Sequence, residues 1–155
     1  MKKIAIISLI CIILDQIVKL IIVDSISLNT SINIMDGFFY LTYVKNFGAA
    51  WSILTGSRIL LIIVAIISLF LIYFILIKNK KLNSFDILCF GLLYGGIIGN
   101  LIDRVVRGYV VDYLEFIIVN YDFPIFNIAD SLIVISISLI IIGMLKEEKN
   151  GLSSR

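Results

Sequence analysis

The segment GNLIDRVVRGYVVDY, residues 99–113, changes abruptly from apolar to charged. Its first residues end a long apolar run, and Asp103, Arg104, Arg107 and Asp112 then follow closely. Segments of about 20 apolar residues are long enough to cross a bilayer. The segment therefore predicts the place where a membrane span ends and a charged site begins.

The composition agrees with a membrane protein. The 155 residues are 61% hydrophobic and 15% charged, whereas soluble domains are about 45–50% apolar. The net charge of +2 is too small to suggest a nucleic-acid partner. The chain has no histidine, which excludes Ser-His-Asp and Cys-His nucleophile arrangements and the HExxH zinc site. Cys11 and Cys89 both lie in apolar segments, so they are interpreted as core residues and neither a metal nor a cofactor is expected.

Four apolar segments predict the spans, and they are residues 4–23, 59–77, 85–102 and 126–145. The basic, apolar N-terminus is also typical of a secretory signal, but no small-residue cleavage site follows and the apolar run continues to Val23. The expected fold class is a membrane α-helical protein with four transmembrane helices and a small extracytoplasmic β-rich cradle. Residues 1–155 are expected to form a single domain.

The basic residues predict an orientation. Threading four spans puts these lysines on one side: Lys2, Lys3, Lys78, Lys80, Lys81, Lys146 and Lys149. The positive-inside rule then places both termini in the cytoplasm and leaves residues 24–57 and 103–123 outside. The external stretches GFFYLTYVKNFGAAW and YVVDYLEFIIV are rich in aromatic and β-branched residues, which favours short strands. Gly108, just before the second stretch, is a candidate helix end.

Charged residues within the spans suggest pairs. Asp15 and Lys19 are four residues apart on one helical face, as are Asp103 and Arg107, so each couple is expected to form an ion pair. Lys19 has an alternative, which is to extend its ammonium group to the outer headgroups.

The third apolar segment carries a stripe of small residues. Its glycines repeat every four residues, at Gly91, Gly95 and Gly99, and predict a smooth surface against which another helix packs. Asn100 and Arg104 share a face at the outer end of the same segment. Either they satisfy backbone groups there, or they contact a substrate.

Asp112 and Asp130 are the candidate catalytic residues. Asp112 lies in an apolar, extended run without a partner at helical spacing. Asp130 lies roughly 22 Å from Leu145 along a helix that crosses a core roughly 30 Å thick, so it is expected below the lipid surface. Phe126, Asn127 and Asp130 are expected in the first turns of this helix. The alternative is that Asn127 caps the helix and that Asp130 or Ser131 only complements its dipole. Brought together, the two carboxylates would share a proton, which is the arrangement of an aspartic protease.

The motifs together resemble the bacterial lipoprotein signal peptidases, also called signal peptidase II. The resemblance extends from DQIVK at residues 15–19, through NFGAAW at residues 46–51 and GGIIGNLIDRVVRGYVVDY at residues 95–113, to FNIADS at residues 126–131. Trp51 stands where the family more often has phenylalanine.

The resemblance implies a four-span aspartyl endopeptidase of the bacterial plasma membrane, acting at the outer membrane–water boundary. It would remove signal peptides from lipid-modified prolipoproteins by cutting before the diacylglyceryl cysteine. Asp112 and Asp130 would be the catalytic pair. The residues implied to line the substrate site are Asn46, Gly96, Asn100, Arg104, Asn127 and Ala129. Asp15, Lys19 and Asp103 would support it structurally.

Two alternatives belong to other classes. A small transporter would use Asp15, Lys19, Asp103 and Asp130 as a proton relay, although a relay needs such groups in both halves of the membrane. A membrane-binding homologue without activity would keep the fold alone. If the chain is a lipoprotein signal peptidase, the expected partners are diacylglyceryl-modified prolipoproteins and membrane lipid. No nucleic acid is expected.

Overall fold

The computed structural model describes residues 1–49, 53–78, 81–119 and 121–153, with side chains described as far as Lys146. Trp51, Lys80 and the side chain of Lys149 therefore lie outside the described residues.

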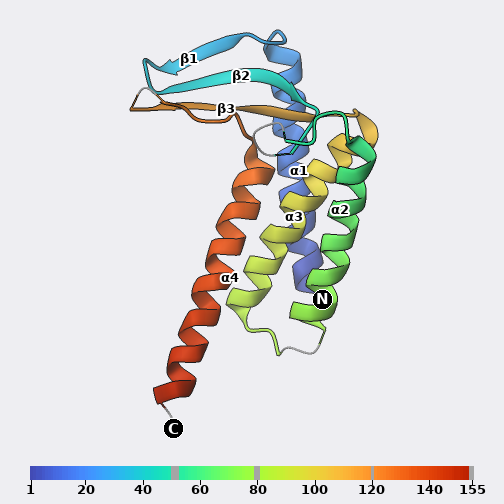
Figure 1. The fold of residues 1–155 in the computed structure, drawn as a ribbon, viewed down its shortest axis with the longest axis vertical. Coiled ribbons are helices and arrows are strands. Elements are labelled where there is room, and N and C mark those ends of the chain that lie inside the picture. The colour runs from blue at the N-terminus through green and yellow to red at the C-terminus, as the bar shows by residue number, and fades with distance from the viewer. Residues whose placement is uncertain (50–52, 79–80, 120, 154–155) are drawn as a thin grey trace.

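Four long helices form the body of the molecule (Figure 1). They are α1 Lys2–Ser25, α2 Arg58–Leu71, α3 Ser84–Val106 and α4 Ile128–Ser153, and the π-helix η2 Ile72–Ile77 continues α2. Each of α1, α3 and α4, and α2 taken together with η2 (Arg58–Ile77), is long and apolar enough to cross a membrane. The N-terminus and the end of α4 both lie at the end of the helices away from the strands. The predicted four-span fold is therefore confirmed.

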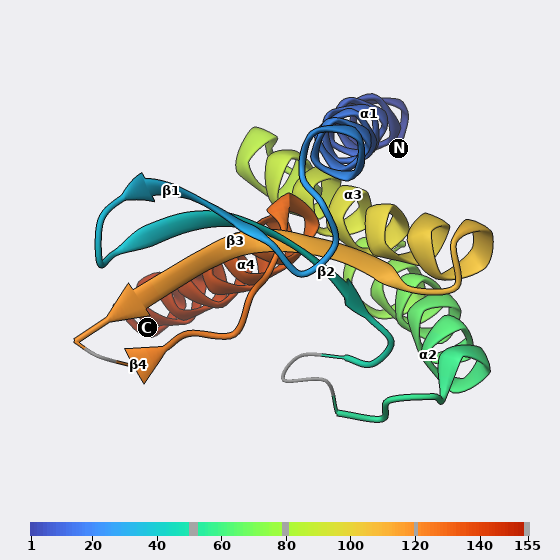
Figure 2. The same cartoon turned by 90° about the horizontal axis from the view of Figure 1, so that it is seen from above.

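A small antiparallel sheet lies across the opposite end of the helices (Figure 2). Its order is β1 Ser31–Met35, β2 Phe39–Asn46, β3 Val110–Ile118 and β4 Tyr121–Asp122. The expected strands after Gly37 and after Gly108 are present as β2 and β3. Gly108 ends α3 as expected, with a φ of 86° that favours glycine and an N–H that donates to the Asp103 carbonyl oxygen at 3.1 Å. This short turn brings Asp103 and Asp112 to the same end of the molecule.

Helix α1 packs against the glycine stripe of α3. A Cβ built on Gly91 would lie 2.6 Å from Ile7 Cγ2, and one built on Gly95 would lie 2.5 Å from Cys11 Cβ. Gly96 faces the other neighbour, since its Cβ would lie 2.5 Å from the Ala129 carbonyl oxygen of α4. The absence of side chains thus lets α3 approach both helices closely. Cys11 and Cys89 are buried free cysteines, which confirms their interpretation as core residues.

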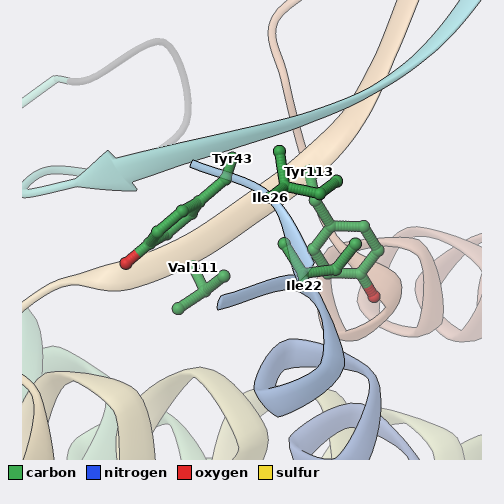
Figure 3. Close-up of a cluster of buried hydrophobic side chains, with 5 residues drawn as sticks. All are labelled: Ile22, Ile26, Tyr43, Val111 and Tyr113. Carbon is green, nitrogen blue, oxygen red and sulfur yellow. The ribbon is translucent and has the colours of Figure 1, made fainter. Parts of the chain in front are cut away.

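A cluster of buried side chains fixes the sheet on α1 (Figure 3). Ile22 near the end of α1, and Ile26 directly after it, pack against Tyr43 of β2 and against Val111 and Tyr113 of β3. Val111 and Tyr113 are the two chain neighbours of Asp112. The packing therefore holds the part of β3 that carries this carboxylate.

One helix start differs from the prediction. Phe126 forms a two-way backbone bridge with Leu114 of β3, and α4 begins only at Ile128. The expectation that Phe126 and Asn127 lie within the first helical turn was therefore wrong. The hydrogen bonds to β3 keep Phe126 extended, and the helix begins only after them.

Candidate active site

Asp112 lies in β3 with its carboxylate held from two sides. Its side chain is buried, with the residue 2% exposed. Its Oδ1 accepts a hydrogen bond from Asn127 Nδ2 at 2.6 Å, and its Oδ2 accepts one from Asn46 Nδ2 at 2.9 Å. Burial and then the nearby charge of Asp130 raise the pKa of Asp112 from 3.8 to about 7, although the two amide hydrogen bonds oppose the rise. The group therefore changes its protonation near neutral pH.

Asp130 lies in the first turn of α4. Its Oδ1 accepts from Asn100 Nδ2 at 2.7 Å, and its Oδ2 accepts from the Asn127 backbone N–H at 3.2 Å. Asn127 Oδ1 in turn accepts from the Asp130 backbone N–H at 3.0 Å, which completes a capping box. The cap considered as an alternative is thus present, and Asp130 takes part in it while also binding Asn100.

Asn127 joins the two carboxylates. It is fully buried, its side chain donates to Asp112, and its backbone donates to Asp130. Its Nδ2 also lies 3.2 Å from Asn100 Oδ1. Two aspartates from a strand and a helix are therefore brought to opposite sides of one asparagine.

The aspartates face empty space on one side. A cavity of about 480 Å³ is lined by both Asp112 and Asp130, together with the segment at residues 123–126 and part of α4. A second cavity of about 600 Å³ lies between α2, α3 and α4 and is lined mostly by apolar side chains. Ala49, Arg104, Asp130 and Ile133 line both cavities. Asp130 thus lies between two largely apolar cavities, and Asp112 lines one of them.

Arg104 and Asn46 hold the chain that follows β2. Arg104 Nη2 donates to the Gly48 carbonyl oxygen at 3.0 Å, and Asn46 Oδ1 accepts from the Gly48 N–H at 2.8 Å. Asn46 Nδ2 also reaches the Ala49 carbonyl oxygen at 3.3 Å. The same two side chains line the 480 Å³ cavity, so they shape both its wall and the loop beside it.

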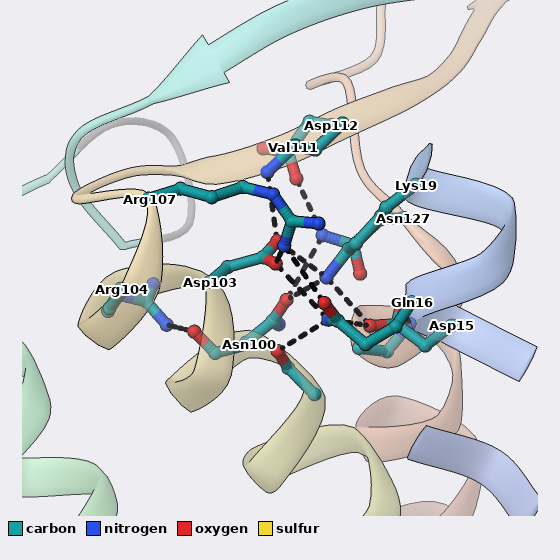
Figure 4. A network of polar contacts seen from close by, with 12 residues as sticks. Asp15, Gln16, Lys19, Asn100, Asp103, Arg104, Arg107, Val111, Asp112 and Asn127 are labelled. Atoms are coloured by element: carbon teal, nitrogen blue, oxygen red, sulfur yellow. Dashed lines mark hydrogen bonds and ion pairs between the residues drawn. The ribbon is translucent and has the colours of Figure 1, made fainter. Parts of the chain in front are cut away.

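A buried charge network lies behind the aspartates (Figure 4). Lys19 Nζ is 2.9 Å from Asp15 Oδ2 and 2.9 Å from Asp103 Oδ2, and all three side chains are fully buried. Arg107 pairs with Asp103 as predicted. The Asp15–Lys19 pair is also confirmed, whereas the alternative of an ammonium group extended to the headgroups was wrong, because the two carboxylates retain it.

The other predicted residues fall into two groups. Asn100 Oδ1 accepts from Lys19 Nζ at 3.0 Å, so both ends of its amide are already bonded within the protein. Gly96 and Ala129 are buried where α3 meets α4. Asn100 therefore binds the Asp130 carboxylate directly, whereas Gly96 and Ala129 form the contact between the two helices.

Sequence reasoning missed Gln16. Its Nε2 donates to Asp103 Oδ1 at 3.1 Å, and its Oε1 accepts from Arg107 Nη1 at 2.9 Å. The signal was an amide within a membrane span, where polar groups are expensive unless they are partnered.

Comparisons with known proteins identify the family. The family model described as "Signal peptidase (SPase) II" matches residues 7–146. The chain is 45% identical over 148 residues to the lipoprotein signal peptidase of Halothermothrix orenii, covering 94% of this chain and 97% of that one. It is 42% identical over 139 residues to the lipoprotein signal peptidase of Staphylococcus aureus, covering 90% and 85%.

Solved structures agree with this. One structure of a bacterial membrane enzyme superposes with a TM-score of 0.88 at 39% identity, covering 97% of this chain and 92% of that chain. Another superposes with a TM-score of 0.83 at 40% identity, covering 94% of each. The chain therefore belongs to the signal peptidase II family of membrane peptidases.

Proposed function

We propose that Asp112 and Asp130 are the catalytic pair with which this signal peptidase removes the signal peptide of a prolipoprotein. The observation that carries the proposal is their arrangement. Asn127 holds one carboxylate through its side chain and the other through its backbone, at the wall of one cavity. Two carboxylates in such surroundings share one proton and act as acid and base.

Asp112 holds the shared proton and Asp130 is the base. Asp112 is buried on a strand, and its pKa of about 7 keeps it protonated up to neutral pH. Each carboxylate accepts two hydrogen bonds, but Asp130 also lies at the N-terminus of α4 and near the positive charge of Arg104, so its negative charge is the better stabilised of the two.

The reaction follows from these roles. Asp130 takes a proton from a water molecule, whose oxygen attacks the carbonyl carbon of the scissile peptide bond, while Asp112 gives its proton to the carbonyl oxygen. The tetrahedral intermediate then collapses, Asp130 gives its proton to the leaving nitrogen, and Asp112 regains its own. Atoms and protons balance, and the peptide bond is replaced by a carboxyl group and an amine.

The substrate meets the site at the membrane boundary. A diacylglyceryl group on the cysteine after the cut keeps the scissile bond near the headgroups, where α3, α4 and the sheet bring the pair together. The largely apolar cavities of about 480 and 600 Å³ suit lipid and an apolar signal peptide. Confinement of the peptide beside the carboxylates lowers the barrier to attack.

The supporting residues act in distinct ways. Asn46 and Arg104 line the substrate cavity and hold its loop, while Asn100 and Asn127 orient the carboxylates. Gly96 and Ala129 act by letting α3 and α4 approach.

The orientation is part of the proposal. The lysines near the termini and after η2 support an orientation with this end in the cytoplasm of a bacterial cell, in which the sheet and the pair would face outward from the plasma membrane. The N-terminus and the end of α4 lie at the end opposite the sheet (Figure 1), which agrees with this orientation. We also predict that the chain forms a single domain. It is predicted to need no cofactor or metal and to bind no nucleic acid.

The test is cleavage of a diacylglyceryl-modified prolipoprotein by the purified protein in detergent. Wild type, Asp112→Asn and Asp130→Asn are compared, and the same precursor without its lipid serves as the substrate control. We expect wild type to cleave the lipidated precursor and not the precursor without lipid. We expect neither variant to cleave either precursor. Full activity in either folded variant, or no cleavage by folded wild type, would contradict the proposal.

A further inference from the structure

Lys19 is the centre of the buried network. Its ion pairs alone do not explain what it contributes to the site. Its ammonium group has three partners: Asp15 and Asp103, each at 2.9 Å, and Asn100 Oδ1 at 3.0 Å. The side chain is fully buried. Buried ion pairs are often no more stable than apolar packing of similar volume, so stability alone explains this arrangement poorly.

Each carboxylate bound to Lys19 also holds the residue just before one of the catalytic aspartates. Asp15 Oδ1 accepts from the backbone N–H of Ala129 at 3.2 Å, and Ala129 precedes Asp130. Asp103 Oδ2 accepts from the backbone N–H of Val111 at 3.1 Å, and Val111 precedes Asp112 (Figure 4). One ammonium group thus ties the start of α4 to β3 through two equivalent bridges.

The hydrogen bond from Lys19 to its third partner, Asn100, fixes the orientation of the Asn100 side-chain amide. Asn100 Oδ1 accepts from both Lys19 Nζ and Asn127 Nδ2, so Asn100 Nδ2 must point to Asp130, 2.7 Å away. The reversed amide would set an N–H group against the ammonium group and an oxygen against a carboxylate. Lys19 therefore determines which atom of Asn100 meets Asp130.

We propose that Lys19 is a positioning residue of the catalytic pair. Through Asp15 and Asp103 it sets the spacing of the two aspartates, and through Asn100 it supplies Asp130 with a fixed hydrogen-bond donor. This rests on the catalytic roles of Asp112 and Asp130 proposed above. Among the described contacts, Lys19 itself makes no hydrogen bond to the carboxylate of Asp112 or of Asp130.

The test uses the full chain in detergent and separates kcat from KM. Lys19→Met removes the ammonium group and keeps an unbranched side chain. Because it leaves Asp15 unpaired, the double variant Asp15→Asn/Lys19→Met is the charge-balanced partner, in which Asp103 retains Arg107. We expect kcat to fall about 100-fold in the folded double variant, with KM within about threefold, since loss of alignment by about 1 Å costs this much.

A double-mutant cycle tests the route through Asn100. If Lys19 acts by orienting Asn100, then Lys19→Met costs much less in an Asn100→Ala background than in wild type. We expect the further loss of kcat in that background to be below about tenfold. Fully additive losses would overturn this route.

Ser8→Ala is the matched control. Ser8 lies in the same α1–α3 interface, is buried, and donates to the Gly91 carbonyl oxygen at 3.0 Å, far along the helix from the pair. It should lower the melting temperature slightly and leave kcat unchanged. A kcat within threefold of wild type in the folded charge-balanced variant would overturn the proposal.

Failure of the catalytic assignment would look different. It would appear as cleavage by Asp112→Asn or Asp130→Asn, measured with the same precursor. Failure of the Lys19 proposal would leave those two variants inactive while the lysine variants cleave normally.

Discussion

Two helices of this protein begin with the same capping box, at opposite ends of the molecule. Asn83 Oδ1 accepts from the Asp86 N–H at 2.9 Å, and Asp86 Oδ2 accepts from the Asn83 N–H at 3.1 Å, at the start of α3. Asn127 and Asp130 repeat this geometry at the start of α4, at 3.0 and 3.2 Å.

The surroundings of the two boxes differ. Asn83 is exposed, and its box caps a helix at the end nearer the termini. Asn127 is fully buried, and its Nδ2 donates to both Asp112 and Asn100, while Asp130 lines two cavities. The shared Asn-x-x-Asp motif therefore explains the helix start in both places. At the proposed catalytic site, the same motif also meets a second carboxylate, Asp112, and a cavity that both aspartates line.

The largest effect is expected from removing the Asn127 side-chain N–H group, which donates to Asp112. Asn127→Ser keeps a side-chain oxygen that caps α4 but loses the N–H group that bonds Asp112. Loss of a donor at a reacting group typically costs about 10²–10³ in kcat, and we expect a loss of this size in single-turnover cleavage assays.

The matched variant is Asn83→Ser, which makes the same exchange in the exposed box. It should leave kcat and KM unchanged. Equal losses of kcat in the two variants would mean that capping alone accounts for Asn127.

The second effect depends on pH. Since the pKa of Asp112 is about 7, the proposed pair loses its acid above that pH. The groups facing it include Lys19, whose positive charge lowers the pKa but does not restore its ordinary value. We expect kcat/KM to fall about tenfold per pH unit above about 7, measured as a pH–rate profile. A profile flat from pH 6 to 9 would contradict this.

Stability should change with pH in the same range. The folded protein holds the Asp112 proton up to about pH 7, whereas the unfolded chain releases it near 3.8, so the free energy of unfolding falls as the pH rises between these values. Asp112→Asn lacks this contribution. The variant should therefore gain in stability relative to wild type from pH 4 to pH 7, as measured by thermal unfolding in detergent.

A third, smaller effect comes from narrowing one of the two cavities that Asp130 lines. Ala65 lines the 600 Å³ cavity on α2, so Ala65→Phe narrows it without touching the carboxylates. We expect KM for the lipidated precursor to rise about tenfold with little change in the melting temperature. Ile66→Phe, at an exposed position of the same helix, is the control and should leave KM unchanged.

The smallest effect concerns the exposed box alone. Asn83→Ala removes the side-chain acceptor for the Asp86 N–H and should cost about 1 kcal/mol of stability, with kcat unchanged. Thermal unfolding measures this loss. A larger loss, or one in activity, would mean that the start of α3 is coupled to the site.

The features that the sequence predicted well are those set by spacing within one helix. The Asp15–Lys19 and Asp103–Arg107 pairs follow from a separation of four residues, and the glycine stripe of α3 follows from the same periodicity. The four spans follow from apolar length, and the positions of the strands follow from residue type.

Contacts between distant segments were harder to predict. Nothing in residues 126–131 alone shows that Phe126 would pair with Leu114 and delay α4, because the partner lies in another element. Likewise, the amide of Asn100 was free for a substrate on sequence grounds, and only the approach of Lys19 and Asn127 occupies it. Assignment of Asp112 and Asp130 to one site depended on the family resemblance as well as on their chemistry.

The junction of the two cavities has a consequence for inhibitor design. Since Ala49, Arg104, Asp130 and Ile133 line both, a compound that fills the two spaces must cross beside Asp130. Two weakly binding fragments, one in each space, would be joined at that crossing by a short linker carrying a hydroxyl group. Linking makes the second binding step intramolecular, so such a compound gains affinity beyond either fragment alone.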